Sequence, residues 1–212
     1  MNKKIVVCCV ACYLCGSQAW AERVPMTLWY DEPATVWMTS ALPVGNGEIG
    51  AMFFGGVEQE QVQFNEKTLW AGSTTRRGAY QNMGDLFFDF DGTGDVVGYR
   101  RELSLDNALG RVSYTMDGVN YVREYFASVL DSVIVVRLST PGDKGKLDFT
   151  LRLQGAHGEK TEAAGCGMAI GGTLDLLSYG AKAVVRPEGG TVECVSEGLQ
   201  VRGADAVTVL VA

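Results

Sequence analysis

The sequence has a single histidine and no surplus of basic residues, and both shortages exclude classes of function. His157 is the only histidine among 212 residues. This excludes metal sites built from several histidines and leaves a Ser-His-Asp triad one possible base. Lys and Arg number 18 against 25 Asp and Glu, for a net charge of −7. Nucleic acid is therefore not expected as a partner, because its phosphates require a basic protein face.

Long apolar runs and helical periodicity are also scarce. After residue 21 no run is long or apolar enough to cross a bilayer, so no membrane span is expected. No segment there keeps a helical period for more than about two turns, and we find neither an internal repeat nor a low-complexity linker. The length suits one sizeable domain or two small ones.

Cysteine becomes scarce once its positions are mapped. Four of the six cysteines lie within the first 15 residues, and only Cys166 and Cys194 lie beyond them. Two cysteines make no disulfide framework for a domain of this length, although they could pair in an oxidising compartment.

Residues 1–21 have the three-part order of a secretory signal peptide. Two lysines precede an apolar stretch that begins at Ile5, and a small-x-small triplet, Ala-Trp-Ala, closes it. We expect cleavage after Ala21, export to the periplasm or the extracellular space, and a mature domain at 22–212. Loss of both lysines leaves 16 basic and 25 acidic residues, a net charge of −9. The alternatives are a lipoprotein anchored at Cys12 and a buried N-terminal helix.

Polar and apolar residues alternate with a period of two along much of the mature chain. The alternation is complete over 61–64 and 147–153 and partial over 85–90. One side chain in two then faces a core, as in a half-buried antiparallel strand. Turn signals such as Asp91-Gly92 recur at close spacing. This pattern predicts an all-β fold, an antiparallel β-sandwich.

A hairpin is predicted around Asp117-Gly118. Apolar residues alternate before this pair, over 111–116, and again after it from Val119. Asp-Gly tolerates the positive φ angles of a tight type I′ turn, which joins antiparallel strands.

Two nearly continuous apolar runs, 133–136 and 206–212, predict inner strands. The second run stops with no polar residues after it, whereas natural termini are usually solvated. We therefore expect a domain cut from a longer protein, or a truncated gene model.

Seven stretches carry a family resemblance, in the same order along the chain. Those at 41–52 and 63–72 contain the distinctive segments, LPVGNG at 42–47 and NEKTLW at 65–70. They are accompanied by LWYDEPA at 28–34, FGG at 54–56, GDL at 84–86, YRRELSLD at 99–106 and RVSYT at 111–115. Together they resemble the N-terminal domain of glycoside hydrolase family 95, the α-L-fucosidase family, over most of residues 26–155.

This resemblance implies an architecture and a reaction. Members have an N-terminal β-sandwich, a helical linker, an (α/α)₆ barrel and a C-terminal β domain. They release terminal α-linked L-fucose with inversion, and some prefer L-galactose. The catalytic acid and the group that activates water lie in the barrel, and no residue here matches their motifs. We therefore assign no catalytic residue, metal or cofactor. The glycan is expected as a partner only through a barrel in the same, longer chain.

One departure from the family is a short bridge between two of these stretches. Many members carry a long, partly helical insertion after the segment that ends at Trp70. This chain has only Ala71–Met83 there, so whatever the longer loop does cannot be transferred to it.

Asn65, Glu66 and Trp70 are the best candidates for contact with a sugar. They offer an amide, a carboxylate and a flat aromatic face, the combination that sugar sites use. They also follow a strand, where sites commonly lie. The alternative is that Trp70 packs in the core or at an interdomain seam, with Glu66 paired to Lys67 or to an arginine.

Asn46 is a further candidate, for a sugar hydroxyl or for the missing domain. It lies between two glycines that allow positive φ, so the alternative is a structural β-turn that enters the next strand. A phosphate-binding loop is not expected, because no lysine follows.

The remaining chemically capable side chains are interpreted as ordinary surface groups. Asp85 and Asp89 are expected to be outward-facing strand acids, and His157 a solvated loop histidine. Arg76-Arg77 is expected to be a solvated loop pair rather than a contact for a carboxylate or a sialylated glycan.

The sequence supports two functions from different classes. One is the N-terminal domain of an exported α-L-fucosidase-like hydrolase, which braces the barrel and lines its cleft. The other is a stand-alone secreted β-sandwich that binds glycan without cleaving it. A related glycoside phosphorylase, or another (α/α)₆ enzyme, fits the motifs less well.

Overall fold

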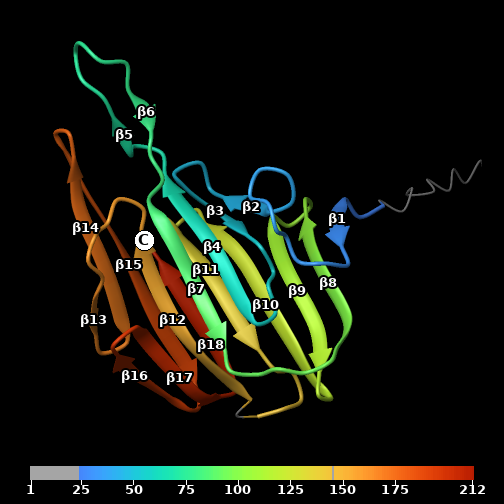
Figure 1. Ribbon diagram of the computed structural model, residues 1–212. Helices are drawn as coiled ribbons and strands as arrows, with labels where there is room; N and C mark the ends of the chain where they lie inside the picture. The colour runs from blue at the N-terminus through green and yellow to red at the C-terminus, as the bar shows by residue number, and fades with distance from the viewer. Residues whose placement is uncertain (1–23, 145) are drawn as a thin grey trace, which may run out of the picture.

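The computed structural model describes residues 24–144 and 146–212, and within these ranges every regular element is a β-strand (Figure 1). The expected signal peptide, with its cleavage after Ala21, lies outside the described residues and stays a prediction. The all-β fold predicted from the alternation is confirmed.

Nine strands form the larger sheet, and every neighbouring pair is antiparallel. Their order across the sheet is β1 (Thr27–Tyr30), β8 (Val96–Ser104), β9 (Leu109–Met116), β10 (Val119–Ser128), β11 (Val133–Ser139), β18 (Ala206–Val211), β15 (Leu177–Glu188), β14 (Gly167–Leu174) and β13 (Glu162–Ala164).

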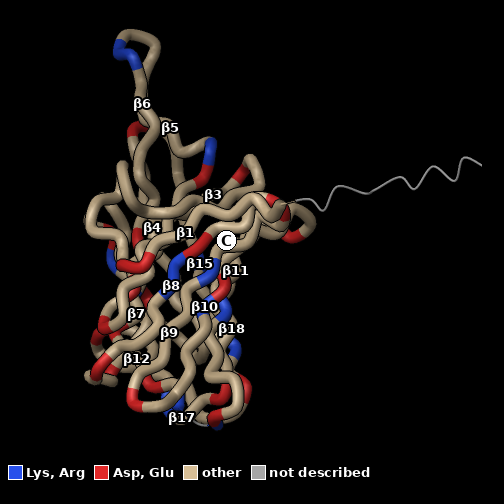
Figure 2. Tube along the Cα trace, turned by 90° about the vertical axis from the view of Figure 1, so that its right-hand side faces the viewer, with Lys and Arg blue, Asp and Glu red and all other residues tan. Residues whose placement is uncertain are grey.

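Seven strands form the second sheet, again with antiparallel pairs throughout. Their order is β16 (Thr191–Val195), β17 (Gly198–Ala204), β12 (Leu147–Gly155), β7 (Gly84–Phe90), β4 (Gln59–Glu66), β3 (Ile49–Phe53) and β2 (Leu42–Gly45). A two-stranded ribbon, β5 (Trp70–Ala71) with β6 (Ala79–Tyr80), projects from one end of the sandwich, as Figures 1 and 2 show.

The alternation places one face of each sheet in a shared core. Leu147, Phe149, Leu151 and Leu153 on β12 are all buried, and the residues between them face outward. The predicted inner strands are also confirmed, because β11 and β18 pair with each other and each has a further partner on its other side. The two sheets therefore enclose one continuous hydrophobic core.

The predicted hairpin is confirmed. Asp117 and Gly118 have φ of 51° and 78°, and Met116 pairs with Val119 across the turn. Both central residues thus occupy the left-handed region that a type I′ turn demands.

An aromatic stack joins the two sheets. The ring of Phe53 on β3 stacks on Tyr125 of β10, with ring centroids 4.3 Å apart and an interplanar angle of 8°. Beside it, a Cβ added to Gly110 on β9 would come within 2.4 Å of the Phe53 ring. Gly110 therefore leaves the space into which Phe53 packs.

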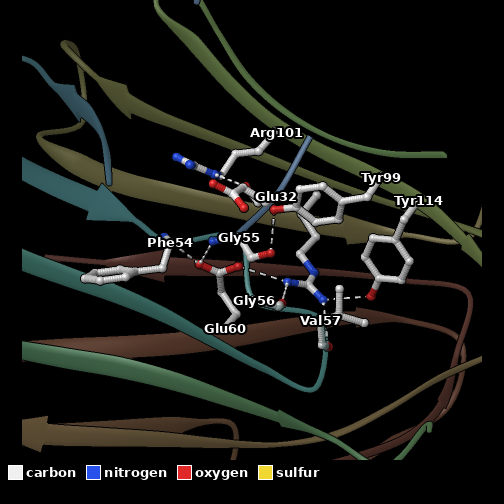
Figure 3. Close-up of polar contacts among 10 residues, drawn as sticks. Glu32, Phe54, Gly55, Gly56, Val57, Glu60, Tyr99, Arg101 and Tyr114 are labelled. Atoms are coloured by element: carbon white, nitrogen blue, oxygen red, sulfur yellow. Dashed lines mark hydrogen bonds and ion pairs between the residues drawn. The ribbon is translucent and has the colours of Figure 1, made fainter. Parts of the chain in front are cut away.

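A buried ion pair joins the sheets beside this stack (Figure 3). Nη1 of Arg123 on β10 lies 2.9 Å from Oε2 of Glu60 on β4, and the two side chains are only 2% and 1% exposed. The other oxygen, Glu60 Oε1, accepts hydrogen bonds from the backbone N–H groups of Phe54 and Gly55. The Arg123 guanidinium also donates to the carbonyls of Gly56 and Val57 and to the Tyr114 hydroxyl.

These contacts offset the cost of burying two charges. Burial raises the pKa of the Glu60 carboxyl, while Arg123 and the amides of Gly55 and Phe54 act to lower it. Removing one partner leaves the other charge without compensation in the core, which is far more costly than removing both.

We predict that Arg123→Met lowers the free energy of unfolding by about 3–5 kcal/mol, because Glu60 would remain buried and unpaired. The double variant Glu60→Leu/Arg123→Met should recover a large part of that loss. Urea unfolding of residues 22–212 measures both. Equal losses in the single and the double variant would contradict the assignment of the pair as a coupled unit.

Candidate functional site

The main concavity is a groove on the outer face of the second sheet, at its β2 edge. It has a volume of about 770 Å³, within the range of small-molecule sites. Gly45 and Gly50 pair across β2 and β3, and Asn65 pairs with Gly50 from β4. The two glycines carry no side chains, so the floor of the groove is open while Asn65 stands at its side.

The first aromatic wall of the groove is Trp37, which is 46% exposed. Trp37 lies in a tight turn in which the Ser40 amide and hydroxyl both donate to the Val36 carbonyl. The buried Arg101 on β8 fixes this segment, since its guanidinium donates to the Glu32 carbonyl (Figure 3) and to the Ser40 carbonyl. Arg101 therefore positions Trp37 from inside the sandwich.

The second aromatic wall is Tyr80 on β6, which is 67% exposed. Trp70 on β5 meets it edge to face, with ring centroids 4.8 Å apart and an interplanar angle of 89°. Trp70 is half exposed and does not line the groove itself. Trp70 is therefore not a core residue. Of the two packing alternatives, the core and an interdomain seam, only the interdomain seam remains.

Asn65 and Glu66 both line the groove, as the sugar-site interpretation requires. Glu66 Oε2 accepts hydrogen bonds from the backbone N–H and the hydroxyl of Thr68, and within the described ranges its Oε1 has no partner. The Asn65 carbonyl Oδ1 accepts from the Glu66 amide. Lys67 does not pair with Glu66, because its ammonium binds Glu48 at 3.0 Å.

Asn46 forms a structural turn. Its Oδ1 accepts from the backbone N–H groups of Glu48 and Ile49, each at 2.9 Å, and its Nδ2 donates to the Ser128 carbonyl at 2.7 Å. The amide thus ties the β2–β3 turn to the β10–β11 turn. Because both of its polar atoms are engaged within the protein, we leave Asn46 out of the binding set proposed below.

Glu48 lies at the same end of the groove. Hydrogen bonds from Lys67 and Ser132 lower the pKa of its carboxyl. A general acid needs a raised pKa, so Glu48 is not suited to protonate a leaving group.

Ala212 lies beside the groove residues. A smaller pocket of about 160 Å³ is shared by Ala212, Glu66, Thr68 and Tyr179. The backbone of Ala212 exchanges hydrogen bonds with Lys182 on β15. The last described residue is therefore fixed next to the strand end that carries the candidate sugar contacts.

The remaining sequence candidates lie outside the groove. Asp85 and Asp89 face outward from β7; burial raises the pKa of Asp85, and a hydrogen bond from Arg152 lowers that of Asp89. His157 is an exposed loop residue whose Nε2 lies 2.9 Å from the Asn82 carbonyl oxygen. Arg76 is not simply solvated, since it pairs with Asp175 at 2.6 Å and links the β5–β6 ribbon to the β14–β15 turn.

In residues 24–144 and 146–212, no group of three or more His, Cys, Asp or Glu side chains is arranged to hold a metal ion. Nor do these residues include a helix with the length and hydropathy needed to cross a membrane.

Sequence reasoning missed Trp37 and Tyr80 as site residues. Trp37 comes with Val36 and Met38, three consecutive apolar residues that do not alternate and are all exposed. An unalternated apolar triplet in a loop is the signal that could have found the first wall. Tyr80 has no such signal, because only the pairing of β5 with β6 brings it to the groove.

We predict that Gly50→Val fills the groove with little effect on stability, within about 0.5 kcal/mol. A Cβ at Gly50 meets only the Val44 carbonyl, at 3.5 Å. Gly110→Ala is the matched control, because its Cβ collides with Phe53; it should cost about 1–3 kcal/mol. Thermal unfolding measures the stability of both variants. A large loss of stability in Gly50→Val would show that the floor of the groove is not open.

Comparison with known proteins shows that this chain is similar to N-terminal domains of glycoside hydrolases. The family model "Glycosyl hydrolase family 65, N-terminal domain" matches residues 28–79 and 73–212. "Alpha-L-fucosidase 2" of Arabidopsis thaliana is 33% identical over 159 residues, covering 56% of this chain and 19% of that protein. "Probable alpha-fucosidase A" of Aspergillus niger is 28% identical over 171 residues, covering 60% and 22%. The chain thus spans about a fifth of the length of these relatives.

Among solved structures, a chain described as a kojibiose phosphorylase from the human microbiome has a TM-score of 0.47 at 10% identity. The likeness covers 89% of this chain and 33% of that chain, and it bears on neither reaction nor substrate. The finer assignment to family 95 stays a prediction. The family-model match extends over most of the described sandwich, and the chain belongs to the family described as glycosyl hydrolase family 65, N-terminal domain.

Proposed function

We propose that this chain is the N-terminal β-sandwich of an exported α-L-fucosidase-like glycoside hydrolase of family 95. The observation that carries the proposal is the 33% identity to an α-L-fucosidase over 159 residues. The hydrolysis, with inversion at α-linked L-fucose or L-galactose, takes place in an (α/α)₆ barrel outside the described residues. The order of residues 1–21 supports export.

The sandwich braces this barrel through the groove and the turns around it. Exposed apolar side chains gather there: Trp37 and Met38 on one side, Trp70 and Tyr80 on the other, and Val129 and Leu130 on the turn beside Asn46. Isolated apolar side chains are normal on a surface, but a cluster of large ones around a concavity is typical of an interface. In a longer chain, the segment after Ala212 would leave the sandwich beside Glu66 and so at this interface.

The groove contributes binding groups rather than catalytic ones. Its carboxylates are Glu48, which is paired with Lys67, and Glu66, which is half engaged with Thr68. The free Oε1 of Glu66 and the amide of Asn65 can accept from and donate to sugar hydroxyls, next to the Tyr80 ring. This end of the sandwich would then form one wall of the cleft in which the barrel acts.

We predict that residues 22–212 alone do not hydrolyse 2′-fucosylated glycans, because the family resemblance places the catalytic acid and the group that activates water in the barrel. A protein that continues into the barrel should release fucose with inversion, which proton NMR detects as the β-anomer before mutarotation. Turnover by the isolated sandwich would contradict the proposal.

A second candidate, a stand-alone carbohydrate-binding sandwich, is favoured by one observation: a groove of about 770 Å³ that joins an amide, a carboxylate and aromatic walls. It predicts that residues 22–212 bind a fucosylated oligosaccharide by themselves. Calorimetric titration tests this, with Trp70→Ala and the groove-filling Gly50→Val as variants.

Binding that Gly50→Val abolishes would favour the stand-alone module. Absence of binding in the isolated sandwich would favour the brace, which needs the barrel to complete the cleft. In the longer enzyme, unchanged kinetics of Trp70→Ala would remove Trp70 from the cleft wall.

A further inference from the structure

The two cysteines of the mature chain lie beside each other although they belong to different sheets. Cys166 sits in the turn between β13 and β14 of the larger sheet, and Cys194 lies on β16 of the second sheet. The Sγ of Cys194 approaches the Gly165 carbonyl oxygen to 3.4 Å, and both cysteines are exposed. Figure 1 shows the β13–β14 turn next to β16.

The backbone places the two thiols near each other. The oxygen that Cys194 contacts belongs to the peptide group that precedes Cys166, so the Cα of Cys166 lies roughly 3 Å from that oxygen. Sγ of Cys194 is therefore at most roughly 6.5 Å from that Cα. The two sulfurs can meet if the exposed side chains rotate towards each other, provided that the two Cα atoms lie within roughly 7 Å. The turn is fixed, because the Val185 amide donates to the Cys166 carbonyl at 2.8 Å and Gly165 takes a φ of 57°. The exposed Cys166 side chain is free to rotate towards its partner.

The edges that carry these cysteines have few other anchors. All three residues of β13 are exposed, and β13 pairs only with β14. β16 pairs only with β17, and of its residues only Val192 packs against the core. Strands with so little buried area open at low free energy, so a covalent link between the sheets would have its largest effect here.

We propose that Cys166 and Cys194 form a disulfide that fastens the two sheets together at this edge. The oxidant is a disulfide compound, either glutathione disulfide or the active-site disulfide of an oxidoreductase. One cysteine thiolate attacks the oxidant and releases one thiol, which gives a mixed disulfide. The second thiolate displaces the other thiol, so two protein thiols are oxidised and one disulfide is reduced.

The test uses residues 22–212, reduced and then incubated with a glutathione redox buffer. The expected product is a monomer that has lost two hydrogen atoms. Trypsin under non-reducing conditions should then yield peptides 161–182 and 183–202 joined through Cys166 and Cys194, since the Arg186-Pro187 bond resists the enzyme. Two free thiols, glutathione on both cysteines, or a cross-linked dimer would each overturn the proposal.

Cys166→Ser and Cys194→Ser are the matched controls, and both positions are exposed, so folding should be preserved. The oxidised protein should melt about 5–10 °C above either variant, because the link closes a loop of the unfolded chain. Hydrogen exchange at β13 and β16 should slow on oxidation. Unchanged melting and exchange would refute the fastening role. The groove lies at the opposite, β2 edge of the second sheet, so these outcomes are independent of the proposed function.

Discussion

The structure depends on the way in which two charges are satisfied between its sheets. Arg123 comes from the larger sheet and Glu60 from the second, and the turn between β3 and β4 supplies the amides and carbonyls that complete their hydrogen bonds. Apolar packing alone tolerates a sheet that slides against its neighbour. A buried pair with fixed partners does not, because displacement leaves a charge unpaired. The pair therefore fixes how the sheets face each other, and the Phe53–Tyr125 stack lies in the same region.

A second buried arginine connects the interior of the sandwich to the groove on its surface. Arg101 is buried like Arg123, but its guanidinium donates hydrogen bonds to backbone carbonyls of the loop that bears Trp37. One side of the candidate site is thus held from the interior, and the other by a ribbon whose base is the buried Leu69. Both walls, one on a loop and one on the β5–β6 ribbon, are held by a rigid framework, which is the common arrangement for binding surfaces. The open floor needs no such support, since it results from the pairing of Gly45 with Gly50.

The strands could be predicted from the sequence because half-buried antiparallel strands require polar and apolar residues to alternate with a period of two. The Asp117-Gly118 hairpin could be predicted because the positive φ values of its turn need particular residues. The same alternation also indicates the buried charge. Glu60 lies two and four residues before the buried Val62 and Phe64, so its side chain faces inward as theirs do. The groove could be predicted only in part. Asn65 and Glu66 are local to one strand end, whereas Trp37 and Tyr80 reach it through loop geometry and strand order, which no local pattern encodes.

The place of β18 has a consequence for the order of assembly. This strand is the last one within the described residues, yet it lies inside the larger sheet, between β11 and β15. During synthesis the larger sheet consequently remains split into two unpaired halves until residues 206–211 emerge. The two halves expose strand edges during that interval, and closure requires contacts between segments far apart in sequence, which slows folding.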